Sequence, residues 1–182
     1  MLNRLWLIVI LTLTTTFAQA QSNNVFVELG GNGILYSINY DRAGWHTEAG
    51  GIAAKISVRA GWGPFALYST DGLGNSGKGI VHFVPVLANL LLGGDHKLEI
   101  GGGVTFIKVN GTINFAGKSF DGSESGPVQT FLLGYRYQKE DAPGLLLRVS
   151  ITPMRIPTFK NSSGTFSGPF FPWGGGSLGY SF

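Results

Sequence analysis

Several features are scarce in this 182-residue sequence, and each scarcity narrows the class of protein. Cysteine is absent, so no disulfide framework and no cysteine-linked lipid anchor is available. Charged residues make up only 13% of the chain and the net charge is +3, which gives no basis for nucleic-acid binding. After residue 20 there is neither sustained helical periodicity nor a run of about 18 apolar residues, which argues against helical membrane spans.

Glycine, in contrast, is abundant. The chain has 29 glycines without a collagen repeat, and aromatic residues make up 13%. Because each glycine costs a helix about 1 kcal/mol relative to alanine, this composition favours strands and turns.

The first twenty residues have the three regions of a secretory signal peptide. Arg4 supplies the positive charge, residues 5–13 are nearly all apolar, and residues 18–20 read Ala-Gln-Ala, a small-residue cleavage pattern. We therefore expect residues 1–20 to be removed and residues 21–182 to form one domain with 12 basic and 10 acidic residues. An uncleaved N-terminal anchor helix is the alternative.

Eight segments have the character of β-strands, and several alternate cleanly between apolar and polar residues. In one of them Ile56, Val58 and Ala60 oppose Ser57 and Arg59. The predicted strands are 24–31, 34–41, 52–62, 79–91, 97–109, 128–138, 145–153 and 173–182. Pro85 makes the phase of the fourth segment ambiguous and predicts a bulge or kink.

The connections between the predicted strands alternate in length. Residues 93–96 and 139–143 are short turns, whereas residues 64–78, 110–127 and 155–172 are predicted to be long loops. Asn32-Gly33 is a tight hairpin signal, and residues 42–51 make a rather long turn. Outer-membrane barrels have short periplasmic turns and longer outer loops, so the pattern favours an all-β, eight-stranded antiparallel up-and-down transmembrane barrel. A soluble barrel or sandwich with an inward apolar face is the alternative.

The small and polar residues opposite the apolar face suit a crowded lumen better than a soluble surface. The last strand carries Tyr180 and Phe182 on its apolar face, and these residues resemble the C-terminal signal strand that the outer-membrane assembly machinery reads. Residues 27–33, 37–42, 98–103, 134–138 and 147–153 resemble segments of small, mostly uncharacterised outer-membrane β-barrels of Gram-negative bacteria. That resemblance implies the outer membrane as location, and lipid, the assembly machinery and periplasmic chaperones as partners. It implies no activity.

Charges of both signs fall on the polar face of the predicted strands. A charge in a narrow lumen must be paired or hydrated. We therefore expect an internal ion-pair network that plugs the barrel, and a gated or selective pore is the alternative. Its predicted members are Glu28, Lys55, Arg59, Glu99, Arg136 and Arg148.

Enzymatic chemistry has little support in the sequence. His82 is the only histidine placed for it, but no serine lies two residues on, as a resemblance to outer-membrane lipid A deacylases would require. We predict no catalytic residue, no metal site and no cofactor, and a lipid A-modifying hydrolase remains a distant alternative.

The last long loop is rich in aromatic residues, which would anchor the rim, cover the lumen or meet an outside ligand. These residues are Phe159, Phe166, Phe170 and Phe171. The sequence thus predicts a monomeric barrel with a structural or surface-interaction role through its outer loops. A small pore or a lateral transporter of a hydrophobic ligand is the alternative.

Overall fold

The computed structural model describes residues 22–49, 51–70, 76–115, 118–140, 142–155, 159–161, 164–166 and 170–182. The predicted signal peptide, residues 1–20, lies outside the described residues. Within the described part of the chain, no helix is long and apolar enough to cross a membrane.

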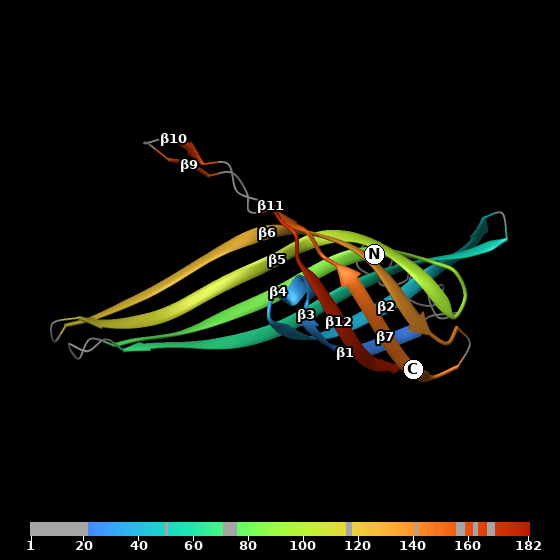
Figure 1. The fold of residues 1–182 in the computed structure, drawn as a ribbon, viewed down its shortest axis with the longest axis horizontal. Coiled ribbons are helices and arrows are strands. Elements are labelled where there is room, and N and C mark those ends of the chain that lie inside the picture. The colour runs from blue at the N-terminus through green and yellow to red at the C-terminus, as the bar shows by residue number, and fades with distance from the viewer. Residues whose placement is uncertain are drawn as a thin grey trace, which may run out of the picture.

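Eight long strands form the body of the protein (Figure 1). They are β1 (Ser22–Gly30), β2 (Tyr36–Ala49), β3 (Ile52–Thr70), β4 (Ser76–Leu92), β5 (His96–Phe115), β6 (Lys118–Gln138), β7 (Gly144–Ile151) and β12 (Gly174–Ser181). A 3₁₀ turn, η1 (Gly31–Gly33), joins the first two strands.

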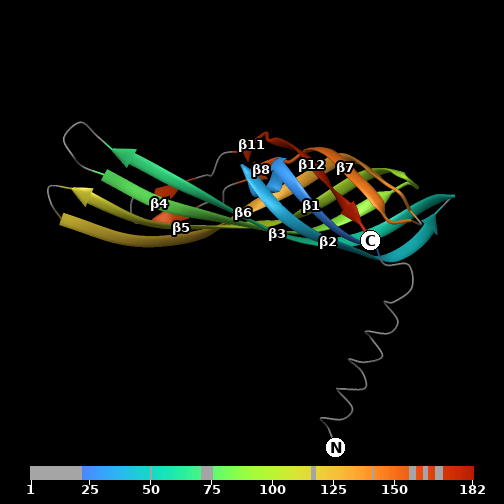
Figure 2. The ribbon, with the colours of Figure 1, turned by 90° about the horizontal axis from the view of Figure 1, so that it is seen from below.

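Each strand pairs antiparallel with the next, and β12 pairs with both β7 and β1, which closes the ring. Val27 lies opposite Leu178 across the closing seam. Seen from below, β1, β12 and β7 lie together at the closed part of the molecule (Figure 2). The structure confirms the predicted eight-stranded antiparallel up-and-down barrel.

Two proline residues interrupt the last two strands without changing their register. The short β8 (Met154–Arg155) continues β7 beyond Pro153, and β11 (Phe170–Phe171) precedes β12 across Pro172. The Thr152 N–H still donates to the Trp173 carbonyl at 2.7 Å. A further two-stranded sheet, β9 (Phe159–Asn161) with β10 (Gly164–Phe166), lies between β8 and β11 in sequence.

Side chains in the ring alternate between a buried inside, which holds most of the polar residues along with apolar ones such as Leu87 and Leu132, and an exposed, mostly apolar outside. On β1, Asn24, Phe26 and Glu28 are buried, while Val25 and Val27 are exposed. The same holds around the ring: the exposed apolar side chains include Ile38, Val58, Leu90, Ile100, Leu133, Leu147, Val149 and Leu178. A barrel that turns its apolar face outward cannot bury it within itself.

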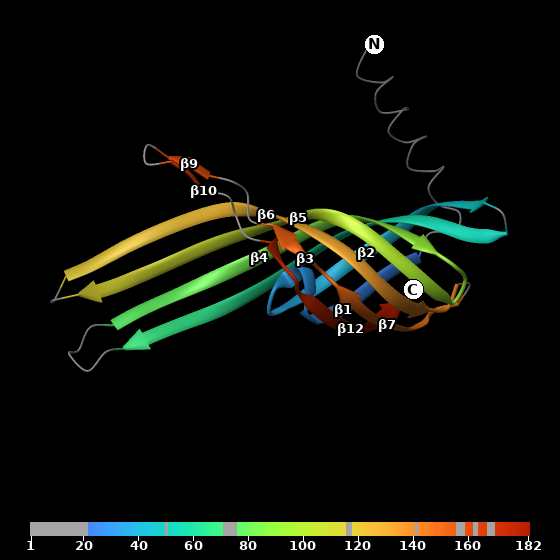
Figure 3. The ribbon, with the colours of Figure 1, turned by 45° about the horizontal axis from the view of Figure 1, so that its top comes forward.

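Two of the predicted long loops are wrong, because strands occupy most of them. Residues 64–70 and 76–78 belong to β3 and β4, and residues 110–115 and 118–127 belong to β5 and β6. The four strands continue beyond the ring as one sheet, which we call the projection: 63–70, 76–83, 107–115 and 118–127 (Figure 3). The predicted inner turn at residues 42–51 is likewise mostly strand, since β2 continues to Ala49.

Pro85, for which the sequence predicts a bulge or kink, forms no bulge. The β4–β5 ladder runs in one register through Pro85, which lies opposite Thr105. On the other side, Gly61 and Trp62 lack partners on β4, yet the register is the same before and after them. The missing proline N–H therefore opens the ladder locally without shifting it.

Candidate functional site

The lumen of the ring holds the largest group of functional side chains. Because side chains alternate along each strand, every second residue of β1–β3 and β5–β7 points into the lumen. Six fully or almost fully buried charged side chains meet there: Glu28 on β1, Asp41 on β2, Arg59 on β3, Glu99 on β5, Arg136 on β6 and Arg148 on β7.

Glu28 joins two arginines from opposite sides of the barrel. Its Oε2 lies 2.8 Å from Arg59 Nη2, and its Oε1 lies 2.7 Å from Arg148 Nη2. Arg148 also donates to Ser177 Oγ at 2.9 Å. A carboxylate with both oxygens engaged by guanidinium groups is a strong charge-assisted arrangement.

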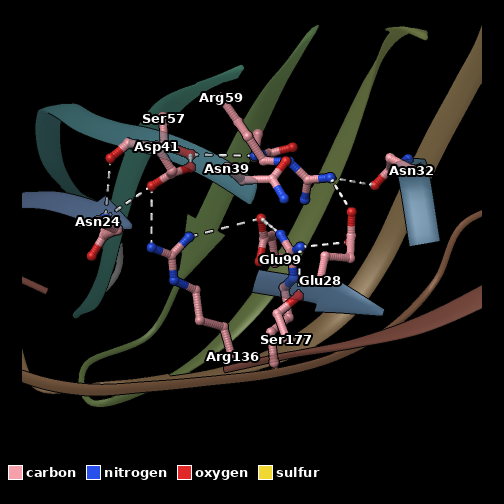
Figure 4. A network of polar contacts seen from close by, with 12 residues as sticks. Asn24, Glu28, Asn32, Asn39, Asp41, Ser57, Arg59, Glu99, Arg136 and Ser177 are labelled. Atoms are coloured by element: carbon pink, nitrogen blue, oxygen red, sulfur yellow. Dashed lines mark hydrogen bonds and ion pairs between the residues drawn. The ribbon is translucent and has the colours of Figure 1, made fainter. Parts of the chain in front are cut away.

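Glu99 and Asp41 continue the series (Figure 4). Glu99 Oε1 lies 3.4 Å from Arg148 Nη1 and 3.8 Å from Arg136 Nη1. Arg136 Nη2 in turn lies 3.1 Å from Asp41 Oδ1. The charges thus alternate in the order Arg59, Glu28, Arg148, Glu99, Arg136, Asp41, and the chain of three cations and three anions is neutral.

Polar and aromatic neighbours complete this lumen network. Ser57 donates to Asp41 Oδ2 at 2.8 Å and Asn24 to Oδ1 at 2.9 Å. The Phe26 ring lies beneath two guanidinium groups, with its centroid 4.6 Å from Arg148 Cζ and 5.4 Å from Arg59 Cζ. These contacts satisfy part of the buried charge, while Arg59 Nη1, Glu99 Oε2 and Arg148 Nε are buried without a hydrogen-bond partner among the described residues.

Lys55 lies apart from the network, near the end of the barrel that holds Ser22 and Phe182. Its Nζ is 2.8 Å from Glu140 Oε1, in the turn after β6. Burial alone would raise the pKa of Glu140, but the hydrogen bond and charge of Lys55 outweigh it and hold that pKa below its ordinary value. Lys97 reaches the same end and donates to the Gln138 carbonyl at 3.2 Å.

The β1–β2 connection crosses the lumen at the end of the barrel opposite Ser22 and Phe182, which we call the outer end. Asn32, fully buried in η1, donates to the Thr130 hydroxyl and, at 3.2 Å, to the Phe131 carbonyl on β6. It accepts a bond of 3.1 Å from Arg59, and Thr105 donates to its backbone carbonyl at 2.8 Å. The connection is therefore tied to β3, next to β2, and to β5 and β6 across the lumen.

The same connection has unusual backbone geometry. Ile34 has φ 68° and ψ −70°, and the Leu35 N–H donates to the Gly33 carbonyl at 2.9 Å, which makes a γ-turn of the rare, strained kind. Trp173 Nε1 donates to the Ile34 carbonyl at 2.9 Å. A Cβ on Gly31 would collide with the Glu28 carboxylate, so no side chain fits between η1 and the lumen network.

Five of the six charged residues predicted for the lumen meet in one network, and Lys55 does not. Sequence reasoning missed Asp41 and Asn32. The sequence could have placed Asp41 in the lumen, because it alternates with Ser37 and Asn39 on the same face of one strand. It could not have placed Asn32 there, because Asn-Gly predicts an exposed hairpin turn rather than a buried side chain.

The aromatic residues predicted for the outer loops are only partly described. Phe170 and Phe171 are exposed on β11. The backbones of Phe159 and Phe166 are paired in register between β9 and β10. Their side chains lie outside the described part of the structure.

His82 lies on the outer face of β4. Its ring stacks on Trp62 at 6.1 Å between centroids, and Lys108 is its neighbour on β5. Among the described residues, no three His, Asp or Glu side chains are grouped to hold a metal ion.

No protein-family model and no curated protein matches this chain. Among solved structures, the chain is similar to a major outer membrane protein from Thermus thermophilus, with 13% identity, coverage of 90% of this chain and 99% of the other, and a TM-score of 0.45. It is also similar to Ail, the attachment invasion locus protein of Yersinia pestis (13% identity, 89% and 95% coverage, TM-score 0.42).

A third similar structure is the N-terminal β-barrel domain of Pseudomonas aeruginosa OprF, with 9% identity, coverage of 89% and 96%, and a TM-score of 0.40. At these identities the likeness concerns the fold alone and transfers no residue role. The closed ring of eight strands is itself what makes this chain an antiparallel β-barrel.

Proposed function

We propose that this protein is a plugged outer-membrane β-barrel that displays the projection outside the cell as an interaction surface. The observation that carries the proposal is the course of β3–β6: in the ring these strands turn apolar side chains outward, and beyond it they form a sheet whose two edges are free. Gly63–Thr70 of β3 and Lys118–Val128 of β6 have no partner strand on their outer sides among the described residues.

The outer face supports membrane insertion. From Ala54 to Trp62 the outward residues of β3 are apolar, a stretch of about 27 Å along the strand at about 3.4 Å per residue. With a strand tilt of about 40° this gives a band about 21 Å tall, slightly less than the roughly 25 Å expected of such barrels. The lumen supports the plugged form, since the network is neutral and Asn32 closes its outer end.

The free edges of the projection support a partner that adds a strand, because unpaired N–H and C=O groups on an edge are a template for another chain. Pro64 and Pro127, at the base of the two edge strands, remove one donor each and limit pairing near the membrane. An extended peptide of a surface or matrix protein is the class of partner that this geometry fits.

Lateral transport of a hydrophobic ligand is a second candidate, which a different observation favours. The inner face of the projection carries exposed Phe65, Leu67 and Val109 above the outer end of the lumen, where β1 and β2 stop.

Membrane fractionation combined with heat-modifiable gel mobility tests the central proposal. We expect the protein in the outer-membrane fraction and a faster-migrating folded band. In planar bilayers the refolded protein should not conduct, and a steady conductance would refute the plugged lumen. Uptake of a fluorescent fatty acid by expressing cells would favour the second candidate.

Assembly into the membrane gives a separate test. We propose that Tyr180 and Phe182, both exposed at the end of the chain, are read by the assembly machinery after periplasmic chaperones deliver the monomeric chain. Phe182→Ser should lower the amount of protein in the outer membrane while the refolded variant keeps its unfolding free energy. Equal loss of both would assign Phe182 a structural role only.

A further inference from the structure

The outer face of β3–β6 changes its chemistry where the strands leave the ring. The continuous apolar belt ends with Trp62 and with Val84, Phe106 and Pro127, of which the last three share one register row. The next row holds Pro64, His82, Lys108 and Ser125. Since residues in register on an antiparallel sheet share a face, polar and basic side chains first join the apolar ones directly beyond the belt, on the side that faces the membrane.

A hollow lies farther along the same face. It has a volume of about 470 Å³. Its outward side chains come from three register rows: Tyr68, Lys78, Ile80, His82, Asn110, Thr112 and Asp121. The side chains include cations, hydrogen-bonding groups, and one aromatic ring, Tyr68, that is 81% exposed.

The position of the hollow relative to the belt indicates what it meets. Tyr68 lies six residues beyond Trp62 on β3, which is about 20 Å along the strand and about 15 Å above the belt at the usual tilt. His82 and Lys108 lie only about 5 Å above it, at the height of lipid phosphates. The hollow itself stands at the height of the sugars that a glycolipid carries above its phosphates.

We propose that this face, with Lys78, Lys108 and the hollow between them, binds the phosphorylated sugar headgroup of an outer-leaflet glycolipid. The inference rests on the proposed insertion in the outer membrane. The two lysines and His82 complement phosphate, as basic surface clusters beside a membrane do for anionic lipids. Asn110, Thr112 and Asp121 match hydroxyl groups fixed on a sugar ring, whereas phosphatidylglycerol carries its two headgroup hydroxyls on a short flexible chain.

The contacts within the hollow fit this assignment. Thr112 donates to Asp121 Oδ1 at 2.6 Å, which holds the Asp121 side chain in the hollow, where a carboxylate is an acceptor for hydroxyl groups. The Tyr68 ring, which is mostly exposed, offers an apolar face of the kind on which sugar rings pack. The hollow is bounded between the strands by the backbones of Gly79, Gly111 and Gly122, which leave room above the sheet.

The test uses the full-length protein in phosphatidylcholine nanodiscs doped with one of three lipids: bisphosphorylated lipid A, dephosphorylated lipid A, or phosphatidylglycerol. The readout is the amount of dopant bound per protein, and heat-modifiable mobility is measured on the same samples. We expect enrichment of phosphorylated lipid A over both other lipids by about tenfold, which corresponds to about 1.4 kcal/mol.

The variant K78Q/K108Q should lose this preference, while Lys139→Gln, in the turn at the opposite end of the barrel, should keep it. Inorganic phosphate at millimolar concentration should not compete, because the lipid is held in the plane of the membrane. The inference is overturned if the wild-type protein enriches no phosphorylated lipid A, if phosphatidylglycerol is enriched equally, if free phosphate competes, or if the double variant keeps the preference. A protein that shows no heat-modifiable band in the nanodiscs counts against the proposed insertion instead.

Discussion

The four strands β3–β6 pass through two regions whose faces differ in chemistry. In the ring the buried inner face holds charged residues such as Arg59 and Glu99 beside apolar ones such as Leu87, and the outer face is mostly apolar. In the projection the inner face carries exposed Phe65 and Leu67, and the outer face combines basic residues such as Lys108 with apolar Ile80.

The backbone pairing stays the same where the side-chain chemistry changes. The β4–β5 ladder keeps one register from Leu92 to Ser76. Side-chain chemistry in this protein therefore varies with the position along the barrel axis, while the hydrogen-bonded ladder maintains the strands throughout.

The ring and the projection should differ most in unfolding free energy when one inward carboxylate is removed from each. Glu28→Gln leaves Arg59 and Arg148 without their shared partner in a buried site, so we expect a loss of about 3–5 kcal/mol in unfolding free energy. Glu124→Gln, at the exposed inner face of β6 in the projection, should change it by less than about 0.5 kcal/mol. Urea unfolding of both refolded variants measures the difference, and similar losses would mean that the network does not depend on burial.

A positive charge on the outer face of β3 should also destabilise the ring more than the projection. Val58→Lys places an ammonium group in the apolar belt of β3 and should cost about 2–4 kcal/mol in a bilayer. Ala66→Lys, on the same face of the same strand in the projection, should cost less than about 0.5 kcal/mol. Unfolding in phosphatidylcholine vesicles gives both values, and equal costs would place the belt outside hydrocarbon.

The inner rim of the ring should respond to pH where the projection does not. Because the folded pKa of Glu140 is lowered, its pair with Lys55 stabilises the protein above the ordinary pKa of 4.5 and loses that effect as the pH falls through the lowered value. Glu140→Gln should cost less than about 1 kcal/mol at about pH 7, since the pair is partly solvated, and progressively less as the pH falls below 4.5. Unfolding curves measured across this range check this, and a constant difference would show that charge is not involved.

The smallest expected change in unfolding free energy concerns η1, which joins β1 and β2 where β3–β6 continue into the projection. Ile34→Gly relieves a β-branched residue at positive φ, worth about 1–3 kcal/mol, but adds about 0.5–1 kcal/mol of unfolded-state entropy. We expect a net gain of a few tenths of a kcal/mol or more in unfolding free energy. A loss would mean that the Ile34 side chain contributes more through packing than its backbone costs.

The sequence predicted the ring well because period-two alternation is visible wherever one face is apolar. It did not predict the projection, because the apolar residues change faces between Trp62 and Phe65 and the segment then reads as an irregular loop. Glycines at 77, 79, 111 and 122 weaken the strand signal further. Only the ladder with neighbouring strands, which a linear pattern does not contain, extends β3–β6 through these residues.

The lumen shows the same division. Parity alone assigns Glu28, Arg59, Glu99, Arg136 and Arg148 to one face, and applied to β2 it would have assigned Asp41 as well. Which carboxylate meets which arginine depends on strand tilt and ring closure, which set the height of each side chain in the barrel.

The sequence by itself determined the number of long strands, their antiparallel order and the side of each strand that is polar, because these follow from local periodicity and turn chemistry. Tertiary structure alone decided the alternating order of charges, the burial of Asn32 across the lumen and the length of the projection. Each of these depends on contacts between residues far apart in the chain, such as Glu28 with Arg148 and Asn32 with Thr130, whose positions are fixed only when the ring closes.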